Sequence, residues 1–254
     1  MSKRTKRRSR GCAPAVLLSL IIVLLCAAVY LLTGAYSYLA AAAAELLCGI
    51  PLCIGLFARK RQAQQNTGVV CTMVGLVAVT AFLLAVPPRM HSDDLRQYRH
   101  QKSLAKLYQE RAVTVPNWFP DFQDDVTGDY LLEYEPGVLR GNGYFSVRFR
   151  TEPERAASYA ALFQAEARDS FLLSTYSDGM HLSLTDADAP AGTQECTLLL
   201  KPAEHFWADD LKQEQTAAVY IMDAGMNGSS PAAGAAIIDT ESGRVQLLQT
   251  GRTP

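Results

Sequence analysis

The chain has 254 residues, of which 49% are hydrophobic and 19% are charged, and its formal net charge at pH 7 is −1. That charge is unevenly divided: residues 1–86 carry nine Lys/Arg and one acid, whereas residues 87–254 carry fifteen Lys/Arg and twenty-four acids. Segments of opposite charge indicate two environments rather than two ordinary soluble domains. The excess of acids in the second segment argues against nucleic acid or an anionic surface as its partner.

The cysteines give no sign of a disulfide framework in the polar segment. Five of the six lie within the first 71 residues, in or beside apolar runs, and only Cys196 lies in the polar segment, where it cannot form an internal disulfide. Cys48 and Cys53 have apolar neighbours and no second pair or histidine nearby, which is not a zinc-site pattern. We interpret the N-terminal cysteines as small packing residues.

The N-terminal segment is first basic and then apolar for longer than one membrane crossing requires. Residues 1–12 contain six basic side chains and no acid, and an apolar stretch over 13–57 follows. One helix of that length would extend about 68 Å, roughly twice the thickness of the hydrocarbon core. We therefore expect a turn at Gly34, which separates transmembrane spans near 13–33 and 37–57.

A third transmembrane span is expected over 68–86, between a basic loop at 59–61 and two prolines that end the helix. Because cytoplasmic loops are enriched in Lys and Arg, we place the N-terminus and this loop in the cytoplasm. Three spans then leave the C-terminal domain outside, in a multi-pass protein of the plasma membrane. A cleaved signal peptide is the alternative, but the apolar run far exceeds the usual h-region of about 7–15 residues.

Glu45 is the only charged side chain within the three expected spans. It lies about 18 Å before the end of the second span, near the middle of a ~30 Å core, where an acid costs on the order of 3 kcal/mol. Its available partners are Ser19, Thr72, Thr80 and backbone carbonyls, so we expect a protonated carboxyl group hydrogen-bonded between helices. Three roles remain open: helix packing in cis or with a partner subunit, proton or ion handling, and an interfacial position nearer to water.

The chain after the third span is expected to form a juxtamembrane segment over 87–115 and an extracytoplasmic domain over 116–254. In the first of these, a broken apolar stripe over 92–113 predicts a helix, with Ser92 as its cap and two aspartates at its positive end. Such a helix would be a stalk or would lie against the domain.

The sequence of the domain itself predicts an α+β fold with a mainly antiparallel sheet. Alternating apolar and polar residues over 144–150 predict a half-buried strand, and the pattern from Pro153 to 169 predicts a helix with that proline in its first turn. A closing hairpin is expected to turn at Ser242-Gly243. Further strands are expected near 130–136, 171–176, 180–185, 196–201 and 217–222.

Few residues carry a chemical signal. His205 lies four residues before Asp209, which could place both on one helical face as a metal pair, but the sequence offers no clear third ligand. His181, in a predicted strand, is a further candidate for metal binding or acid–base chemistry. A calcium loop could begin with Asp186 and Asp188, but its third ligand position is Pro190 and its twelfth residue is Thr197 rather than glutamate. We predict no metal and no cofactor.

Three functions are compatible with this sequence. The first is a membrane-anchored protein that presents an extracytoplasmic domain for binding another protein, a peptide or an envelope component, without catalysis. The second is an accessory subunit of a membrane complex or transporter, with Glu45 at a helix–helix interface or on a proton path. The third is an extracytoplasmic hydrolase that uses His181 or His205 with nearby acids. The lack of a complete catalytic motif in the sequence favours the first, with a protein partner in the membrane or on the outer surface.

Overall fold

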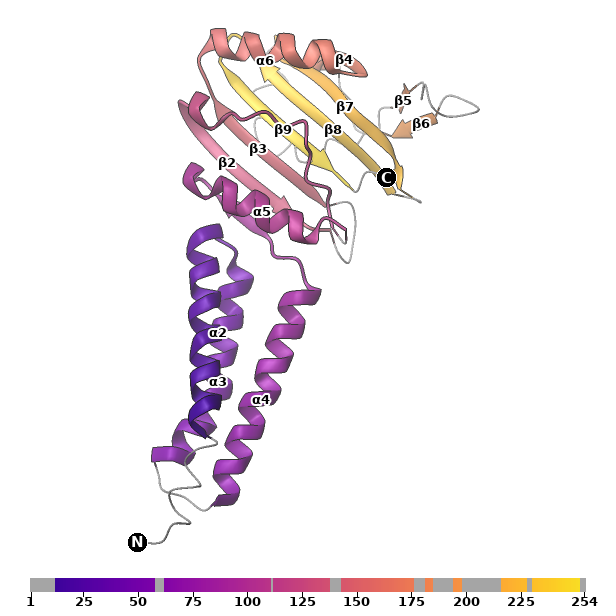
Figure 1. Ribbon diagram of the computed structural model, residues 1–254. Helices are drawn as coiled ribbons and strands as arrows, with labels where there is room; N and C mark the ends of the chain where they lie inside the picture. Colours follow the sequence, from indigo (N-terminus) through magenta and orange to yellow (C-terminus); the bar gives the residue numbers. More distant parts are fainter. Residues whose placement is uncertain are drawn as a thin grey trace. The chain divides into compact units, whose positions relative to one another are not determined.

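The computed structural model describes residues 12–57, 62–110, 112–137, 143–175, 181–184, 194–197, 216–227 and 230–251. The contacts within the chain divide it into two compact units, Met1–Pro88 and Arg89–Pro254. The described elements of the first unit are helices, and the second unit is built on a sheet (Figure 1).

Three helices make up the described part of the first unit: α2 (Cys12–Thr33), α3 (Tyr36–Phe57) and α4 (Gln62–Ala85). They form where the sequence predicts helices. The turn expected at Gly34 is confirmed, since this residue has a φ of 68°, a left-handed conformation that glycine adopts without a steric penalty.

The helices differ in how far they meet the requirements of a membrane span. Within the described residues, one segment is long and apolar enough to cross a membrane, Val16–Thr33 of α2. The apolar segments of α3 and α4 are shorter, Tyr36–Ile50 and Val69–Leu83. In α4 the first turns are polar, because they carry the sequence QAQQN. One apolar helix near the N-terminus is therefore found, and the prediction of three transmembrane helices is not confirmed.

The second unit contains a seven-stranded antiparallel sheet with the strand order β1-β2-β3-β9-β8-β7-β4 (Figure 1). A separate antiparallel pair is formed by β5 and β6. The predicted α+β class with an antiparallel sheet is confirmed. The strands are β1 (Met90–Ser92), β2 (Gly128–Glu135), β3 (Tyr144–Arg150), β4 (Asp169–Leu172), β5 (His181–Leu184), β6 (Gln194–Thr197), β7 (Ala218–Asn227), β8 (Ser230–Asp239) and β9 (Arg244–Thr250).

The long helix α6 (Pro153–Glu166) joins β3 to β4 at the far edge of the sheet and contacts β7 and β8 on the way. Its start at Pro153 is as predicted. The strand predicted over 171–176 is shorter than expected, since β4 ends at Leu172 and the 3₁₀ turn η3 (Leu173–Thr175) follows.

The helix predicted from Ser92 begins later than expected. Met90–Ser92 is instead the edge strand β1, whose three residues pair with β2. The 3₁₀ turn η1 (Leu95–Gln97) and the helix α5 (Tyr98–Tyr108) follow it. Pairing with a neighbouring strand satisfies backbone groups that the first turn of a helix would leave without partners, which explains the later start.

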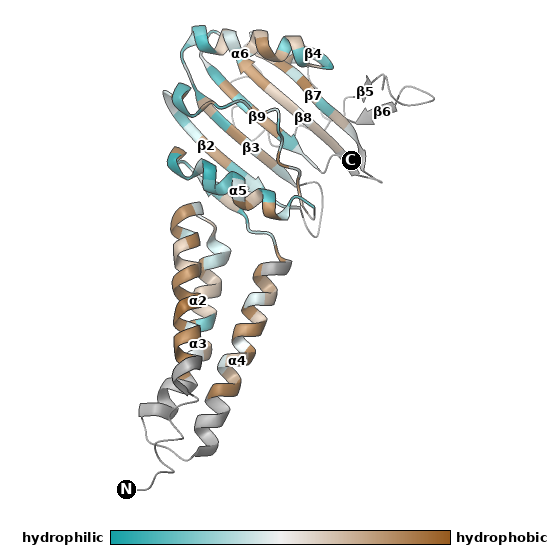
Figure 2. Ribbon diagram, in the orientation of Figure 1, coloured by the Kyte–Doolittle hydropathy of each residue, from teal (hydrophilic) through white to brown (hydrophobic). Residues whose placement is uncertain are grey.

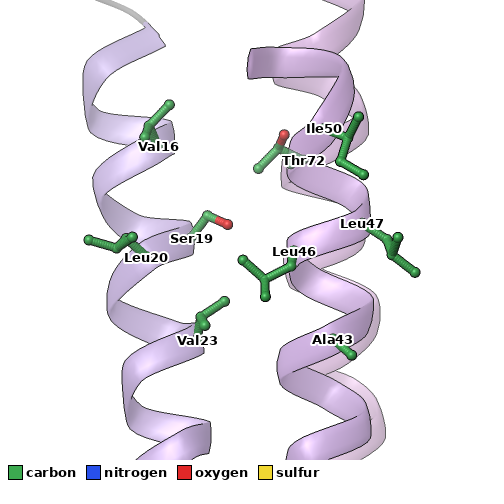
Figure 3. Close-up of a pocket in the computed structure, with 10 residues that line it drawn as sticks. Val16, Ser19, Leu20, Val23, Ala43, Leu46, Leu47, Ile50 and Thr72 are labelled. Atoms are coloured by element: carbon green, nitrogen blue, oxygen red, sulfur yellow. The ribbon is translucent and has the colours of Figure 1, made fainter. Parts of the chain in front are cut away.

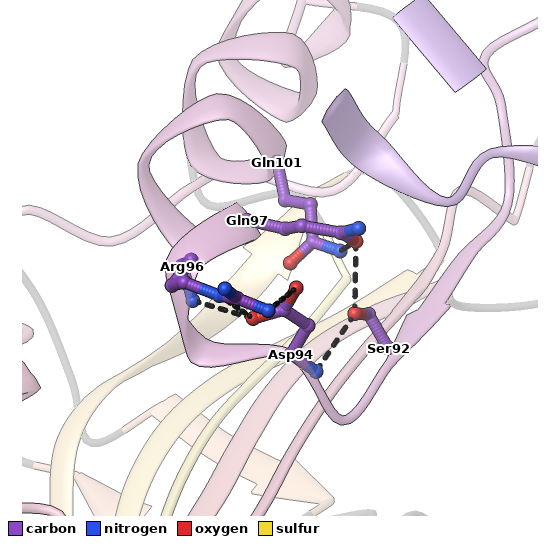
Figure 4. Close-up of polar contacts among 5 residues, drawn as sticks. All are labelled: Ser92, Asp94, Arg96, Gln97 and Gln101. Atoms are coloured by element: carbon purple, nitrogen blue, oxygen red, sulfur yellow. Dashed lines mark hydrogen bonds and ion pairs between the residues drawn. The ribbon is translucent and has the colours of Figure 1, made fainter. Parts of the chain in front are cut away.

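A small polar network fixes the passage from β1 into α5 (Figure 4). The Asp94 carboxylate caps η1 by accepting a hydrogen bond from the Arg96 N–H at 3.0 Å. The Ser92 hydroxyl accepts from the Asp94 N–H at 3.1 Å and donates to Gln97 Oε1 at 3.0 Å. Asp94 thus caps η1, whereas α5 follows Gln97 without a side-chain cap, so the prediction of Ser92 as the helix cap is wrong. Because the chain divides after Pro88, this whole segment belongs to the second unit.

One face of the sheet is covered by an aromatic cluster that the segment 112–125 contributes to. Phe122 stacks on Phe149 of β3 with 4.7 Å between ring centroids. Trp118 meets Phe163 of α6 edge to face, with 5.8 Å between their centroids. The 3₁₀ turn η2 (Gln123–Asp125) is tied to α6 as well, because the Asp125 carboxylate accepts a hydrogen bond from the Tyr159 hydroxyl. Aromatic contacts with β3 and α6 therefore hold this irregular segment in place.

Gly234 of β8 is required where Trp118 covers the sheet. A Cβ at this position would lie 2.7 Å from Gln249 Oε1 and 3.1 Å from the indole nitrogen of Trp118. A Cβ at this position would therefore force the Gln249 amide to shift and the Trp118 indole to give way slightly, within a packed region of the sheet.

We predict that Gly234→Ala destabilises the second unit by about 1–3 kcal/mol, the usual range for overpacking. Thermal unfolding of the purified full chain, followed by tryptophan fluorescence, would measure the effect. Gly128→Ala is the matched control, because a Cβ at Gly128 meets no atom within 4 Å. Equal unfolding temperatures for the two variants would contradict the close contact described.

Candidate functional site

Glu45 is fully buried among the three helices of the first unit. It has 0% exposed surface and carries the only carboxyl side chain of residues 1–88. On α4, Gly75 faces it: a Cβ at that position would lie 3.6 Å from Glu45 Oε2. On α2, the buried thiol of Cys26 is close enough to interact with it electrostatically. The only acid of the unit thus lies inside it.

The Glu45 carboxyl group makes no hydrogen bond to the described residues. Of the side chains considered from the sequence, Thr72 donates to the Cys48 carbonyl oxygen at 3.3 Å, and Thr80 is exposed. Ser19 is buried elsewhere, beside Gly49. The hydrogen bond expected from these three side chains is therefore not formed. A buried carboxyl group without a hydrogen-bond partner is costly.

The helices α3 and α4 approach each other very closely next to Glu45. A Cβ at Gly75 would lie only 2.7 Å from both Cβ and Sγ of Cys48. Small residues allow such close packing between helices. From the sequence we expected close helix packing at the alanines and Gly49 of α3, but not at Gly75. The sequence of a helix does not reveal which residue of another helix its glycine faces.

An apolar groove of about 660 Å³ lies between α2 and α3 (Figure 3). Ser19 of α2 and Leu46 of α3 extend into the gap between these helices (Figure 3). Its two hydroxyl-bearing residues, Ser19 and Thr72, are buried, whereas Leu46 and Leu47 are exposed. The lining residues are Val16, Ser19, Leu20, Val23, Ala43, Leu46, Leu47, Gly49, Ile50 and Thr72. An apolar surface, rather than a polar ligand, fits this groove.

The polar candidates from the second segment are not brought together by any described contact. His181 lies on β5 opposite Thr197 of β6. His205 and Asp209 lie outside the described residues. Among the residues that the structure does describe, no group of three or more His, Cys, Asp or Glu side chains could hold a metal ion.

A groove of about 420 Å³ in the second unit was not foreseen from the sequence. It lies between α5 and the segment 119–123. Arg99 spans it by donating from Nε to Gln123 Oε1 at 2.8 Å. The Lys102 ammonium lies 5.6 Å from the centre of the Tyr98 ring. The basic residues at 99, 102 and 106 have the spacing of one helical face. Nothing in the sequence indicated that the segment 119–123 would lie opposite them and close the groove.

A scan against protein-family models finds no match for this chain, and searches of curated proteins and of solved structures find no significant match either.

We predict that Gly75→Ala separates α3 from α4 and destabilises the helical unit by about 1–3 kcal/mol. Gly49→Ala is the matched control on the neighbouring helix, because its Cβ would come no closer than 3.9 Å to Ser19 Oγ, an ordinary contact. The unfolding temperatures of both variants would be measured in the same detergent, with resistance of the helical unit to protease as the signal. A less stable Gly49→Ala variant would contradict the packing described.

Proposed function

We propose that this chain is a multi-pass membrane protein whose second unit lies outside the cell and serves as a binding domain. The observation that carries the proposal is the distribution of exposed apolar side chains. Of the 22 large hydrophobic side chains exposed in the described residues, 18 lie on α2, α3 and α4, and three lie in the second unit. Figure 2 shows the apolar character of α2 along its described length.

The polarity of the helical unit is the reverse of that of a soluble bundle. Its outward surface carries leucine, isoleucine and valine, whereas Ser19, Glu45 and Thr72 are buried. A soluble protein rarely exposes a continuous apolar surface of this kind, and lipid is the solvent that matches it. This arrangement supports all three helices lying in the bilayer, although the apolar segments of α3 and α4 are shorter than that of α2.

The orientation in this proposal follows from charge. The basic residues of the first segment lie in 1–12 and 59–61, at the two positions that three spans would place on one side of the membrane. The positive-inside rule assigns that side to the cytoplasm. The second unit would then lie outside, where a sheet domain can bind another protein, a peptide or a component of the cell envelope.

We expect a cysteine introduced at Leu162, an exposed position of α6, to react with a membrane-impermeant maleimide in intact cells. The protein would carry no other cysteine. The same experiment with Ser2→Cys should give labelling only after lysis, because the N-terminus would be cytoplasmic. Labelling of Leu162→Cys only after lysis would overturn the proposed orientation.

A second candidate function rests on Glu45. We propose that the three helices part when they bind a membrane partner, so that Glu45, which is buried among them, contacts a helix of that partner and the chain acts as its accessory subunit. The carboxyl group is buried without a hydrogen-bond partner in the described residues, and α3 and α4 come very close beside it. An intramembrane acid is retained at a cost of on the order of 3 kcal/mol, and a hydrogen bond from a partner would offset part of that cost.

The Glu45→Gln substitution keeps the size of the side chain and removes its acidity. If Glu45 binds a partner helix, crosslinking in intact cells followed by affinity purification should recover at least about tenfold less partner from this variant, equivalent to about 1.4 kcal/mol. Glu154→Gln, at an exposed position of α6, is the control. A partner captured equally by both variants would assign binding to the second unit instead.

A further inference from the structure

We propose that the groove between α5 and the segment 119–123 binds a phosphomonoester. It is lined by Tyr98, Arg99, Lys102, Ser103, Lys106, Phe119, Pro120, Asp121 and Gln123. The inference does not depend on the membrane topology proposed above, because the groove belongs to the second unit alone.

The first support is an excess of positive charge without ion pairs. Arg99, Lys102 and Lys106 form no ion pair with the described residues. The acid that lines the groove, Asp121, interacts with Lys102 only at longer range. Elsewhere in this unit, five arginines are paired with carboxylates: Arg89, Arg96, Arg150, Arg155 and Arg168. Apart from the Arg99 Nε–H, which donates to Gln123, the N–H groups of these cations are thus available to a ligand.

The second support is mutual repulsion between these cations. Lys102 and Lys106 are four residues apart on α5, a spacing at which like charges destabilise a helix. Burial and the neighbouring Lys106 both lower the pKa of the Lys102 ammonium, while Asp121 opposes them only as the weakest influence. A bound anion would relieve this repulsion, so the binding of an anion would also stabilise α5.

The third support is the nature of the walls. Tyr98, Phe119 and Pro120 give the groove an apolar side, and Tyr98 is only 4% exposed. Its hydroxyl has no hydrogen-bond partner among the described residues, although a buried hydroxyl normally has one. A volume of about 420 Å³ is within the range of small-molecule sites. The groove can therefore hold an anionic group attached to a small organic body.

The charge balance selects the kind of anion. Three cations and one carboxylate give the lining a net charge of +2. A phosphomonoester carries about −1.5 to −2 at neutral pH, whereas a carboxylate carries only −1 and would leave one cation uncompensated. Lysine ammonium groups are common partners of phosphate. The acidic balance of residues 87–254 disfavours large polyanions but not a small ligand held by local charges.

Two sources of a phosphomonoester can be separated with the full chain purified in a neutral detergent. Glycerol 3-phosphate is the soluble probe, titrated by calorimetry. Nanodiscs containing phosphatidic acid, compared with nanodiscs of phosphatidylcholine, supply the lipid probe, with the unfolding temperature of the second unit as the readout. Binding of glycerol 3-phosphate supports a soluble ligand, and stabilisation by phosphatidic acid alone supports a lipid headgroup.

The variants test whether the groove is the site. Lys102→Gln together with Lys106→Gln should weaken binding of the active probe by about tenfold or more, since charge-assisted contacts are lost. Asp121→Asn should strengthen binding severalfold, a gain that loss of folding cannot imitate. Arg150→Gln, which removes a cation paired with Asp129 elsewhere in the unit, is the matched control and should leave binding unchanged. The proposal is overturned if neither probe binds, or if the lysine variant binds as the wild type does.

Discussion

The pairing of β3 with β9 is the interaction on which the rest of the second unit depends. Seven residue pairs, from Tyr144↔Thr250 to Arg150↔Arg244, join strands about one hundred residues apart in the chain. This pairing connects the β2–β3 hairpin to the β7–β8–β9 meander and so makes one sheet of two local structures. The side chains take part as well, because the buried Gln246 amide donates to the Ser146 hydroxyl at 3.1 Å. Such non-local contacts carry a large entropic cost of closure, which the buried aromatic face offsets.

Both units bury polar groups, but for opposite physical reasons. In the sheet unit, apolar side chains leave water for the core, and some polar groups buried with them are tied to neighbours, as the Asp239 carboxylate is to the Thr216 and Ser242 hydroxyls. In the helical unit most of the large apolar side chains remain exposed, and the buried apolar cluster is small, made by Cys26, Ala41, Ala42 and Val79, so burial of apolar surface holds the helices together less strongly. Close contacts such as Gly75 with Cys48 add to the cohesion of the helices, and the single buried acid lies beside this contact.

The sequence predicted those elements whose signals are local. Alternation over β3, the proline that opens α6 and the Ser242-Gly243 turn were each found where they were expected. Gly243 is required there, since it has a φ of 69° and a Cβ would lie 2.1 Å from the Thr151 carbonyl oxygen. The strand β1 was missed because three residues are too few for a periodic pattern, and its identity comes from pairing with β2.

The same distinction between local and non-local signals separates the two candidate sites. A carboxyl group in an apolar run is visible in the sequence, so Glu45 could be selected, but its neighbour Gly75 lies on another helix and could not. The groove on α5 could not be predicted for a different reason. The net charge of a whole segment does not show a local excess of positive charge within it. The segment 87–254 is acidic as a whole, yet some of its acids are held in ion pairs with arginines elsewhere, as Glu135 is with Arg89 and Asp129 is with Arg150. Because those acids are engaged elsewhere, the cations of α5 keep their charge uncompensated, and an acidic domain can present a positive groove.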